Sequence, residues 1–329
     1  MTWHNGRSYC KAAISFLNIK AIINIRQGGD GVDFVKELIN FITQFINGLN
    51  LGSIYALIAL GYTMVYGIAK MLNFAHGDVI MVGAYTISVV TTGLGMPPLA
   101  SVLISVVVCA TLGVSIEKIA YKPLRNASPL TVLITAIGVS YFLQSAALLI
   151  FGSKRQKVES VVHMNPVKIG PIELTGEAIV TLGVTLVIMI ALTLFIKKTK
   201  IGKAMLAVSE DKGAAQLMGI NVNQTISITF AIGSALAAIA GTLFVSSYNF
   251  VSPYSGSLPG IKAFVAAVLG GIGSIPGAMI GGILLGIIES LSKAYISTEL
   301  ADAIVFGVLI IVLLVKPTGL LGKMRTDKV

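Results

Sequence analysis

The sequence predicts an all-α polytopic membrane protein with about eight transmembrane helices, some of them broken or re-entrant. Hydrophobic residues make up 55% of the 329 residues and charged residues only 12%, with a mean hydropathy of +0.88. Both proportions lie far outside the range of ordinary soluble domains. The apolar residues form long continuous runs, whereas transmembrane β-barrels show short segments of alternating polarity. We therefore expect one helical membrane domain over residues 32–329.

The first apolar run, around residues 34–66, is too long for a single perpendicular crossing. Polar and small residues interrupt it, namely Asn47, Gly48, Asn50, Gly52 and Ser53. We expect a bend or an unwound turn near Gly48–Gly52 that faces the bundle interior, where protein or water can satisfy the backbone. Seven further runs of spanning character follow, near 79–94, 99–116, 130–151, 178–196, 226–248, 274–292 and 302–315.

The segment 248–290 is the richest in glycine and proline. If helix 226–248 runs outward and the C-terminus lies inside, residues 250–316 must cross the membrane an odd number of times. The spans 274–292 and 302–315 account for an even number, so the short piece 261–270 must also cross or dip as half of a broken helix. Small residues at four-residue spacing let helices approach closely. On this basis we favour helix packing over direct contact with a substrate for Gly233, Gly241, Gly277, Gly281, Gly282 and Gly286.

The formal charge of +10 is distributed in short clusters between the apolar runs, and no continuous basic face argues for nucleic-acid binding. Three clusters fall on one side of the membrane if 130–151 and 178–196 each cross once: Lys118, Lys122 and Arg125; Lys197, Lys198, Lys200 and Lys203; Lys316, Lys323, Arg325 and Lys328. The positive-inside rule then makes the C-terminus cytoplasmic and residues 152–177 an outside loop.

Residues 1–31 form an N-terminal extension with four basic residues and a short apolar run, but no cleavage pattern of a signal peptide follows that run. A single crossing by 34–66 would place these basic residues on the outer side, against the positive-inside rule. We hypothesise that the extension is not translated and that synthesis starts at Val32, read from a GTG codon. A disordered or interfacial N-terminal arm is the alternative.

The loop 197–224 contains a short amphipathic helix with Met205, Leu206, Leu217 and Met218 as its apolar surface. Ser209 is the expected N-cap, with Glu210 and Asp211 in the first turn. Gly219 is the expected C-terminal stop. The spacing of Ala214, Ala215 and Gly219 resembles the "EAA…G" loop by which ABC-importer permeases contact their ATPases. Gly213 stands at the position of the glutamate, and Glu210 is the candidate for its acidic role.

The stretch "MLNFAHGDVIMVGAY" places Asn73, His76 and Asp78 close together in an apolar chain. One interpretation is structural, with Asn73 as a helix cap, Asp78 near a helix N-terminus and His76 bonded to backbone. The other is a functional break between helices that lines a pathway or transmits movement, with His76 as the best candidate. No second His or Cys is spaced for a zinc site, and Glu289, the acid well inside an apolar run, has no evident partner.

The chain resembles the LivH-type permeases of bacterial branched-chain amino-acid ABC transporters from about residue 34 to its C-terminus. The resemblance rests on "NGLNLGSIYALIALGYTMVYGI" (47–68), "NFAHGD" (73–78), "SPLTVLITAIGVSYFLQ" (128–144), "SEDKGAAQLMGIN" (209–221), "KAFVAAVLGGIGSIPGAMIGGILLGIIES" (262–290) and "KPTGLLG" (316–322). It implies a multi-pass protein of the bacterial cytoplasmic membrane that imports leucine, isoleucine or valine. The expected partners are a LivM-like second permease, two cytoplasmic ATPases and an extracytoplasmic binding protein.

No segment matches the P-loop pattern, so ATP and Mg²⁺ are expected in the partner ATPases and no cofactor in this chain. The Asn47 and Asn50 region and the Asn73–Asp78 region are the candidates for the pathway. Two alternatives remain: the same type of permease for urea or short-chain amides, or a stand-alone secondary transporter. The sequence leaves open which amino acid is preferred and which residues touch it.

Overall fold

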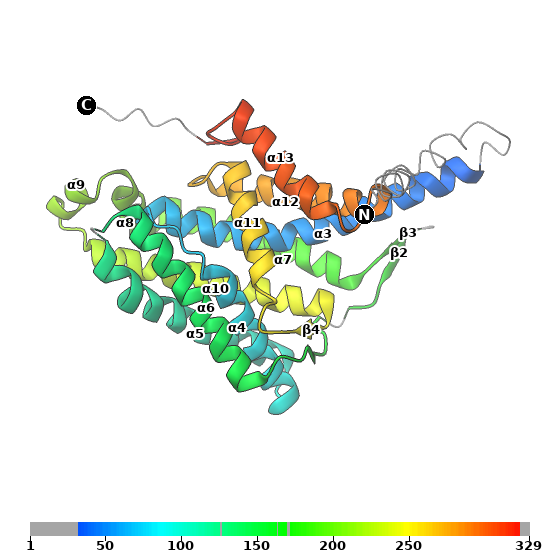
Figure 1. Cartoon of the computed structure of the whole chain (residues 1–329), viewed down its shortest axis with the longest axis horizontal. Coiled ribbons are helices and arrows are strands. Elements are labelled where there is room, and N and C mark those ends of the chain that lie inside the picture. Colours follow the sequence, from blue (N-terminus) through cyan, green and yellow to red (C-terminus); the bar gives the residue numbers. More distant parts are fainter. Residues whose placement is uncertain (1–31, 126, 163, 170–171, 323–329) are drawn as a thin grey trace, which may run out of the picture.

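The structure is a computed structural model that describes residues 32–125, 127–162, 164–169 and 172–322 (Figure 1). The N-terminal extension, residues 1–31, lies outside the described residues. Helices dominate the described part, which confirms the all-α polytopic fold. Within it, six helices are long and apolar enough to cross a membrane: α3 (Val32–Ala69), α5 (Pro98–Ile116), α6 (Pro129–Phe151), α7 (Gly176–Lys198), α10 (Val222–Tyr248) and α12 (Ile275–Tyr295).

Shorter elements make up the rest of the secondary structure in the described residues, and the total of about eight crossings stays a prediction. The shorter helices are α4 (His76–Ser88), α8 (Lys200–Glu210), α9 (Lys212–Leu217), α11 (Ser257–Gly270) and α13 (Ala301–Val315). The π-helix η2 (Val89–Gly93) continues α4, while η3 (Glu117–Tyr121) and the 3₁₀ turn η4 (Lys122–Leu124) continue α5. Two small antiparallel pairs join β1 (Gln156–Lys157) to β4 (Phe250–Val251) and β2 (Val167–Ile169) to β3 (Ile172–Leu174).

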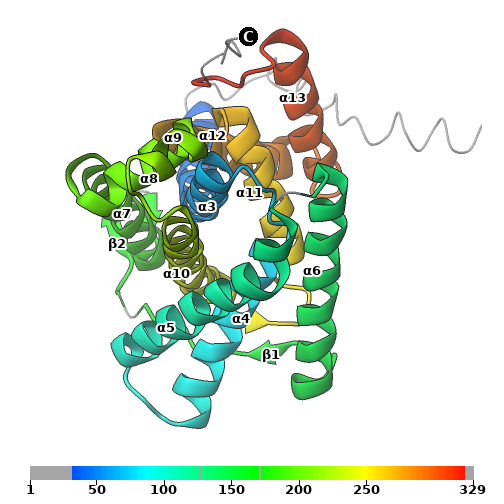
Figure 2. The same ribbon diagram turned by 90° about the vertical axis from the view of Figure 1, so that its left-hand side faces the viewer.

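The bundle is arranged around α3, which contacts α10, α11 and α12 (Figure 2). The helices α8 and α9 lie at one end of the molecule, and the hairpin β2–β3 lies at the other (Figure 1). The loop between α11 and α12 lies at the end that carries α9, because a Cβ on Gly67, near the end of α3, would be 3.3 Å from Gly273 Cα. The long axis of the bundle therefore separates a helical end from a strand-bearing end.

Glycines bring α3 and α12 into close contact. A Cβ atom on Gly52 would lie 2.8 Å from Ile283 Cα, and one on Gly286 would lie 2.2 Å from Gly52 Cα. Only glycine allows two backbones to approach this closely. The expected unwound turn near Gly48–Gly52 is therefore wrong: α3 is continuous through these residues, and their small side chains serve the contact with α12.

The other glycines that we expected to pack do so. A Cβ on Gly281 would lie 2.1 Å from the Ala266 carbonyl oxygen of α11, and Cβ atoms on Gly241, Gly277 and Gly282 would meet neighbouring backbone at 2.4–2.7 Å. A Cβ on Gly233 would have a looser contact, 3.2 Å from Val65 of α3. These contacts are those expected of a packing role for this set, which stays a prediction. They also explain why small residues recur at four-residue spacing along α10, as Gly233, Ala237 and Gly241, and why glycines do so along α12.

The chain between α3 and α4 is not helical, although it lies inside the bundle. Lys70 adopts a positive φ of 59° directly after α3, and Asn73 is buried. His76, the first residue of α4, packs against Gly61, which lies about two turns before the end of α3. The segment 70–75 therefore runs back along α3 toward the middle of the bundle, and a break separates α3 from α4.

The short helix α11 begins where it meets this break. A Cβ on Gly256 would lie 1.9 Å from the Gly77 carbonyl oxygen, and one on Gly260 would lie 2.8 Å from Gly77 Cα. The N-terminus of α11 thus abuts the first turn of α4. At its other end Gly271 has a φ of +102°, a conformation that favours glycine. The piece 261–270 is accordingly part of a short helix between two turns, in line with the expected half-helix.

Candidate functional site

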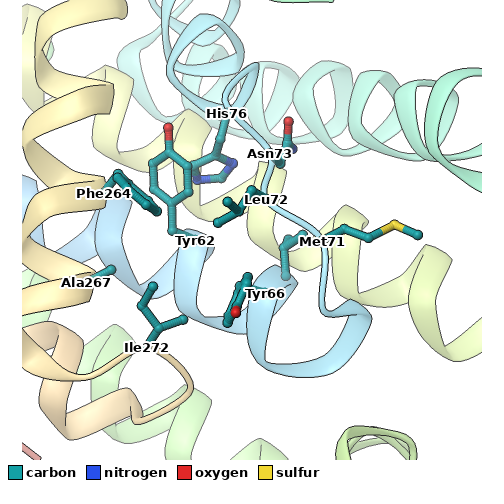
Figure 3. A pocket seen from close by; sticks show the side chains of 10 residues that line it. Tyr62, Tyr66, Met71, Leu72, Asn73, His76, Phe264, Ala267 and Ile272 are labelled. Carbon is teal, nitrogen blue, oxygen red and sulfur yellow. The ribbon is translucent and has the colours of Figure 1, made fainter. Parts of the chain in front are cut away.

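His76 lies buried at the start of α4, against α3 (Figure 3). Its ring meets the Tyr62 ring edge-on with 4.7 Å between centroids. Gly61 makes room for it, because a Cβ there would lie 2.4 Å from His76 Nε2. That nitrogen has no hydrogen-bond partner among the described residues. A cavity of about 10 Å³, the size of one water molecule, lies between the ring, the 71–73 segment and Phe264 of α11.

Asn73 does not cap α4, and this part of the structural interpretation is wrong. The N-cap is Ala75, and no side chain of the described residues caps the helix there. Asn73 Oδ1 instead accepts a 2.9 Å hydrogen bond from the Tyr121 hydroxyl. The reason is the path of the 70–75 segment, which brings Asn73 beside η3 and so ties the break to the end of α5.

Asp78 lies in the first turn of α4, as expected, and it is buried. Its Oδ1 accepts a 2.9 Å hydrogen bond from Gln144 Nε2 of α6. The same amide lies 3.2 Å from Ser257 Oγ, at the start of α11. Gln144, which the sequence analysis did not single out, therefore joins α4, α6 and α11 where the two short helices begin.

The structure does not bring Asn47 and Asn50 to this break. Asn47 is exposed, whereas Asn50 Oδ1 is buried without a hydrogen-bond partner in the described part of the chain. Eleven positions separate Asn50 from Gly61, the neighbour of His76, which corresponds to about 16 Å along a helix. A pathway role for the two asparagines stays a prediction, and it would be at a place distant from the break around His76.

Two helices, not one, form the projecting element between α7 and α10, which we call the α8–α9 elbow (residues 200–219). Asp211 caps α9, since its Oδ1 accepts a 2.9 Å hydrogen bond from the Ala214 backbone N–H. Ser209 is therefore wrong as the N-cap: it lies in the last turn of α8 and donates a 2.7 Å hydrogen bond to the Leu206 carbonyl. The chain becomes extended only at Asp211, with a φ of −149°, so the cap lies two residues later than expected.

Gly219 ends the elbow as predicted, with a φ of +81°. Its N–H donates to the Gln216 carbonyl, and the next N–H, of Ile220, donates to the Ala215 carbonyl. This pair of bonds is the Schellman arrangement that glycine favours at a helix end. The tip carries two strongly exposed apolar side chains, Leu217 at 90% and Met218 at 82% exposure.

Lys212 fastens the elbow to the bundle. Its Nζ donates a 3.0 Å hydrogen bond to the Ala69 carbonyl at the end of α3. Burial, with a further contribution from the positive charge of Arg125, lowers the pKa of Lys212 below its ordinary value. Next to it, Arg125 forms an ion pair with the buried Glu117 of η3, which also accepts a 2.6 Å hydrogen bond from Ser227 of α10. Sequence reasoning did not single out Glu117.

A second group of charged side chains lies deeper in the bundle. Glu289 is buried and contacts Lys262, Lys293 and Tyr55, and Lys262 also contacts Asp302. The expectation that Glu289 has no partner is therefore wrong. Its main partner, Lys262, lies in the short apolar helix α11, and a lysine in such a segment is itself the signal that could have revealed the pair.

Comparisons with known proteins agree with this arrangement. The family model of the branched-chain amino acid transport system / permease component matches residues 44–313. The chain is 46% identical to the high-affinity branched-chain amino acid transport system permease protein LivH of Escherichia coli K12, over 89% of this chain and 99% of that protein. It is 45% identical to BraD of Pseudomonas aeruginosa, over 90% of this chain and 100% of that protein.

A more distant relative is the permease protein LivM of Salmonella typhimurium. It is 26% identical, over 83% of this chain and 68% of that protein. The matched region contains the break around His76, the α8–α9 elbow and the glycine contacts of α12. The chain therefore belongs to the family of permease components of branched-chain amino acid transport systems.

Proposed function

We propose that this protein is a membrane-spanning permease subunit of an ATP-driven importer of leucine, isoleucine and valine. The observation that carries the coupling part of this proposal is the α8–α9 elbow, which presents Leu217 and Met218 almost fully exposed at one end of the bundle. Two large apolar side chains on a projecting turn suit insertion into a groove of a partner protein. The substrate class is supported by the names of the relatives LivH and BraD.

Contacts connect the elbow to the broken helices. Lys212 holds α9 to the last carbonyl of α3, where the non-helical segment 70–75 begins. Asn73 within that segment is bonded to Tyr121, and His76 lies at its end. A displacement of α9 would therefore reach the α4–α11 junction through a short path of bonded groups. It would shift the equilibrium between two conformations of the permease only if these contacts differ between them.

In this proposal the ATPase and binding functions belong to other subunits. Two cytoplasmic ATPases bind ATP and Mg²⁺ and contact the elbow. Glu210 and Asp211 are the acidic residues of the elbow in this contact. A LivM-like permease pairs with this chain, and the related LivM sequence supports that pairing. An extracytoplasmic protein delivers the amino acid, and the elbow and the C-terminus face the cytoplasm of a bacterial cell.

A reconstituted complex tests the function. The chain is assembled in proteoliposomes with its companion permease, ATPases and binding protein, and uptake of radiolabelled leucine is measured with and without ATP. We expect ATP-dependent accumulation that unlabelled isoleucine and valine reduce but urea and acetamide do not. Competition by urea or acetamide would instead support the amide-type permease, and uptake by the chain alone on an ion gradient would support a secondary transporter.

A further inference from the structure

Among the described residues, one group of ionisable side chains joins α3, α11, α12 and α13, and we call it the Lys262 cluster: Tyr55, Lys262, Glu289, Lys293 and Asp302. Lys262 Nζ lies 2.8 Å from Glu289 Oε1 and 2.7 Å from Asp302 Oδ1. Glu289 also lies 2.6 Å from Lys293 Nζ and accepts a 2.9 Å hydrogen bond from the Tyr55 hydroxyl. Opposite charges thus balance one another at a depth where unpaired charges are costly.

Each buried charged member of the Lys262 cluster, Lys262 and Glu289, has more than one partner. The side chains of Lys262 and Glu289 are only 7% and 1% exposed, whereas those of Asp302 and Lys293 are 44% and 38% exposed. If the contact between Lys262 and Glu289 opened, Lys262 would keep Asp302, and Glu289 would keep Lys293 and Tyr55. The contact between Lys262 and Glu289 can therefore open without leaving a buried charge unpaired. An unpaired buried charge is what makes breaking most buried ion pairs costly.

The helix that carries Lys262 has the features of an element that can shift. It has 14 residues, and its C-terminal turn contains Gly271 with a φ of +102°. Two of its contacts pass through glycine, with Gly260 against Gly77 of α4 and Gly281 of α12 against Ala266, while Phe264 packs against the rings of Tyr62 and Phe74. The glycine contacts leave room for small sliding movements, and the ion pairs of Lys262 add a charged anchor to the position of α11.

We propose that Lys262 is a positioning residue for transport: it holds α11 to Glu289 in this conformation and is held by Asp302 alone when α11 shifts during the transport cycle. The inference rests on the proposed function, because the shift is a step of import. The location of α11 suits this role. Its N-terminus abuts the first turn of α4. Near its C-terminus the Leu269 carbonyl accepts a 2.8 Å hydrogen bond from the Leu320 N–H.

The variant Asp302→Asn separates this role from a structural one. In the conformation seen here Lys262 would keep Glu289, so the melting temperature should change by less than about 2 °C. In the shifted conformation Lys262 would have no anionic partner. We expect the Vmax of leucine import to fall about tenfold, equivalent to about 1.4 kcal/mol in the barrier, with an unchanged KM. Hydrolysis of ATP should continue although import is reduced. Lys293→Gln should act in the same direction, because Glu289 would lose its second lysine.

The matched control is Glu299→Gln, an exposed carboxylate three positions before Asp302, which should import at the wild-type rate. Import by Asp302→Asn at the wild-type rate would overturn the inference. So would a loss of import that only follows a loss of folded complex or a lowered melting temperature. A wild-type complex that does not import leucine would overturn the proposed function and this inference together, whereas a normal wild type with a normal Asp302→Asn would overturn only the inference.

Discussion

Lys212 and Ala69 are 143 residues apart in the chain and are joined by a 3.0 Å hydrogen bond from Nζ to the backbone carbonyl. This bond connects the projecting helix α9 to the last residue of α3, at the point where the chain turns back into the bundle. The carbonyl is one of those that a helix end leaves without an intrahelical donor. The bond therefore links α9 to the point where the break between α3 and α4 begins.

Replacing Lys212 by Met should weaken the coupling of ATP hydrolysis to import. The change removes a charged donor from a helix-end carbonyl, a bond worth about 1.5–3 kcal/mol, and it leaves the apolar tip of α9 unchanged. We expect the ATPase subunits to copurify normally while leucine import falls about tenfold or more. Lys203→Met, at an exposed position of α8, should import normally. Wild-type import by Lys212→Met would show that this bond carries no coupling.

The cap of α9 should depend on Asp211 and not on Ser209. Loss of a capping side chain costs about 1 kcal/mol, and Asp211 accepts the Ala214 N–H. Asp211→Ala should therefore reduce ATPase copurification and import severalfold, and Asp211→Asn should retain most of both. Ser209→Ala should be close to wild type, because its hydroxyl bonds a carbonyl of its own helix. The reverse order of effects would restore Ser209 as the cap.

The contact between α3 and α12 should not tolerate a methyl group. Gly286→Ala would place its Cβ 2.2 Å from Gly52 Cα, and overpacking of this kind costs about 1–3 kcal/mol or more. A clear drop in the melting temperature of the detergent-solubilised protein is expected. For comparison, a Cβ on Gly138 of α6 meets no described atom within 4 Å, so Gly138→Ala should leave the melting temperature unchanged or raise it slightly, because alanine favours the helix. Equal melting temperatures for both variants would contradict the close packing.

Gly61 and His76 should show coupled effects. A Cβ at Gly61 would lie 2.4 Å from His76 Nε2, so Gly61→Ala must displace the imidazole from the start of α4. The single variant should lower import, and the double variant Gly61→Ala with His76→Ala should show no further loss beyond His76→Ala alone. Groups in contact are non-additive in such a cycle. Additive losses in the double-mutant cycle would mean that the two residues act independently.

Features that depend on residues close together in the chain are predictable from the sequence. The long helices, the break near Asn73 and the glycine stop at Gly219 follow from hydrophobic length, polar residues in the membrane and backbone conformation. The sequence does not distinguish an unwound turn from a continuous helix at Gly48–Gly52, because small residues suit a close helix contact as well as an unwound turn. Only the position of α12 decides between the two.

Other features depend on contacts between distant segments. Ser209 and Asp211 are both good capping residues, and the choice between them follows from α8 continuing through Glu210 with Met205 buried in the bundle. The partners of Lys262 come from two other helices, α12 and α13. No periodicity within one helix encodes such a pairing, so an ionisable residue in an apolar run signals that a partner exists without naming it.

The most direct test of the account is ATP-driven leucine accumulation by the reconstituted complex that carries Leu217→Asp with Met218→Asp. Burial of each of these side chains in a partner is worth about 1.5–3 kcal/mol, so the charged variant should lose ATPase binding and import while the membrane domain stays folded. Thr298→Asp, an exposed position on a different loop between α12 and α13, controls for added charge and should import normally. Wild-type accumulation of leucine by the Leu217→Asp with Met218→Asp complex, or by the purified chain without partners, would contradict the account.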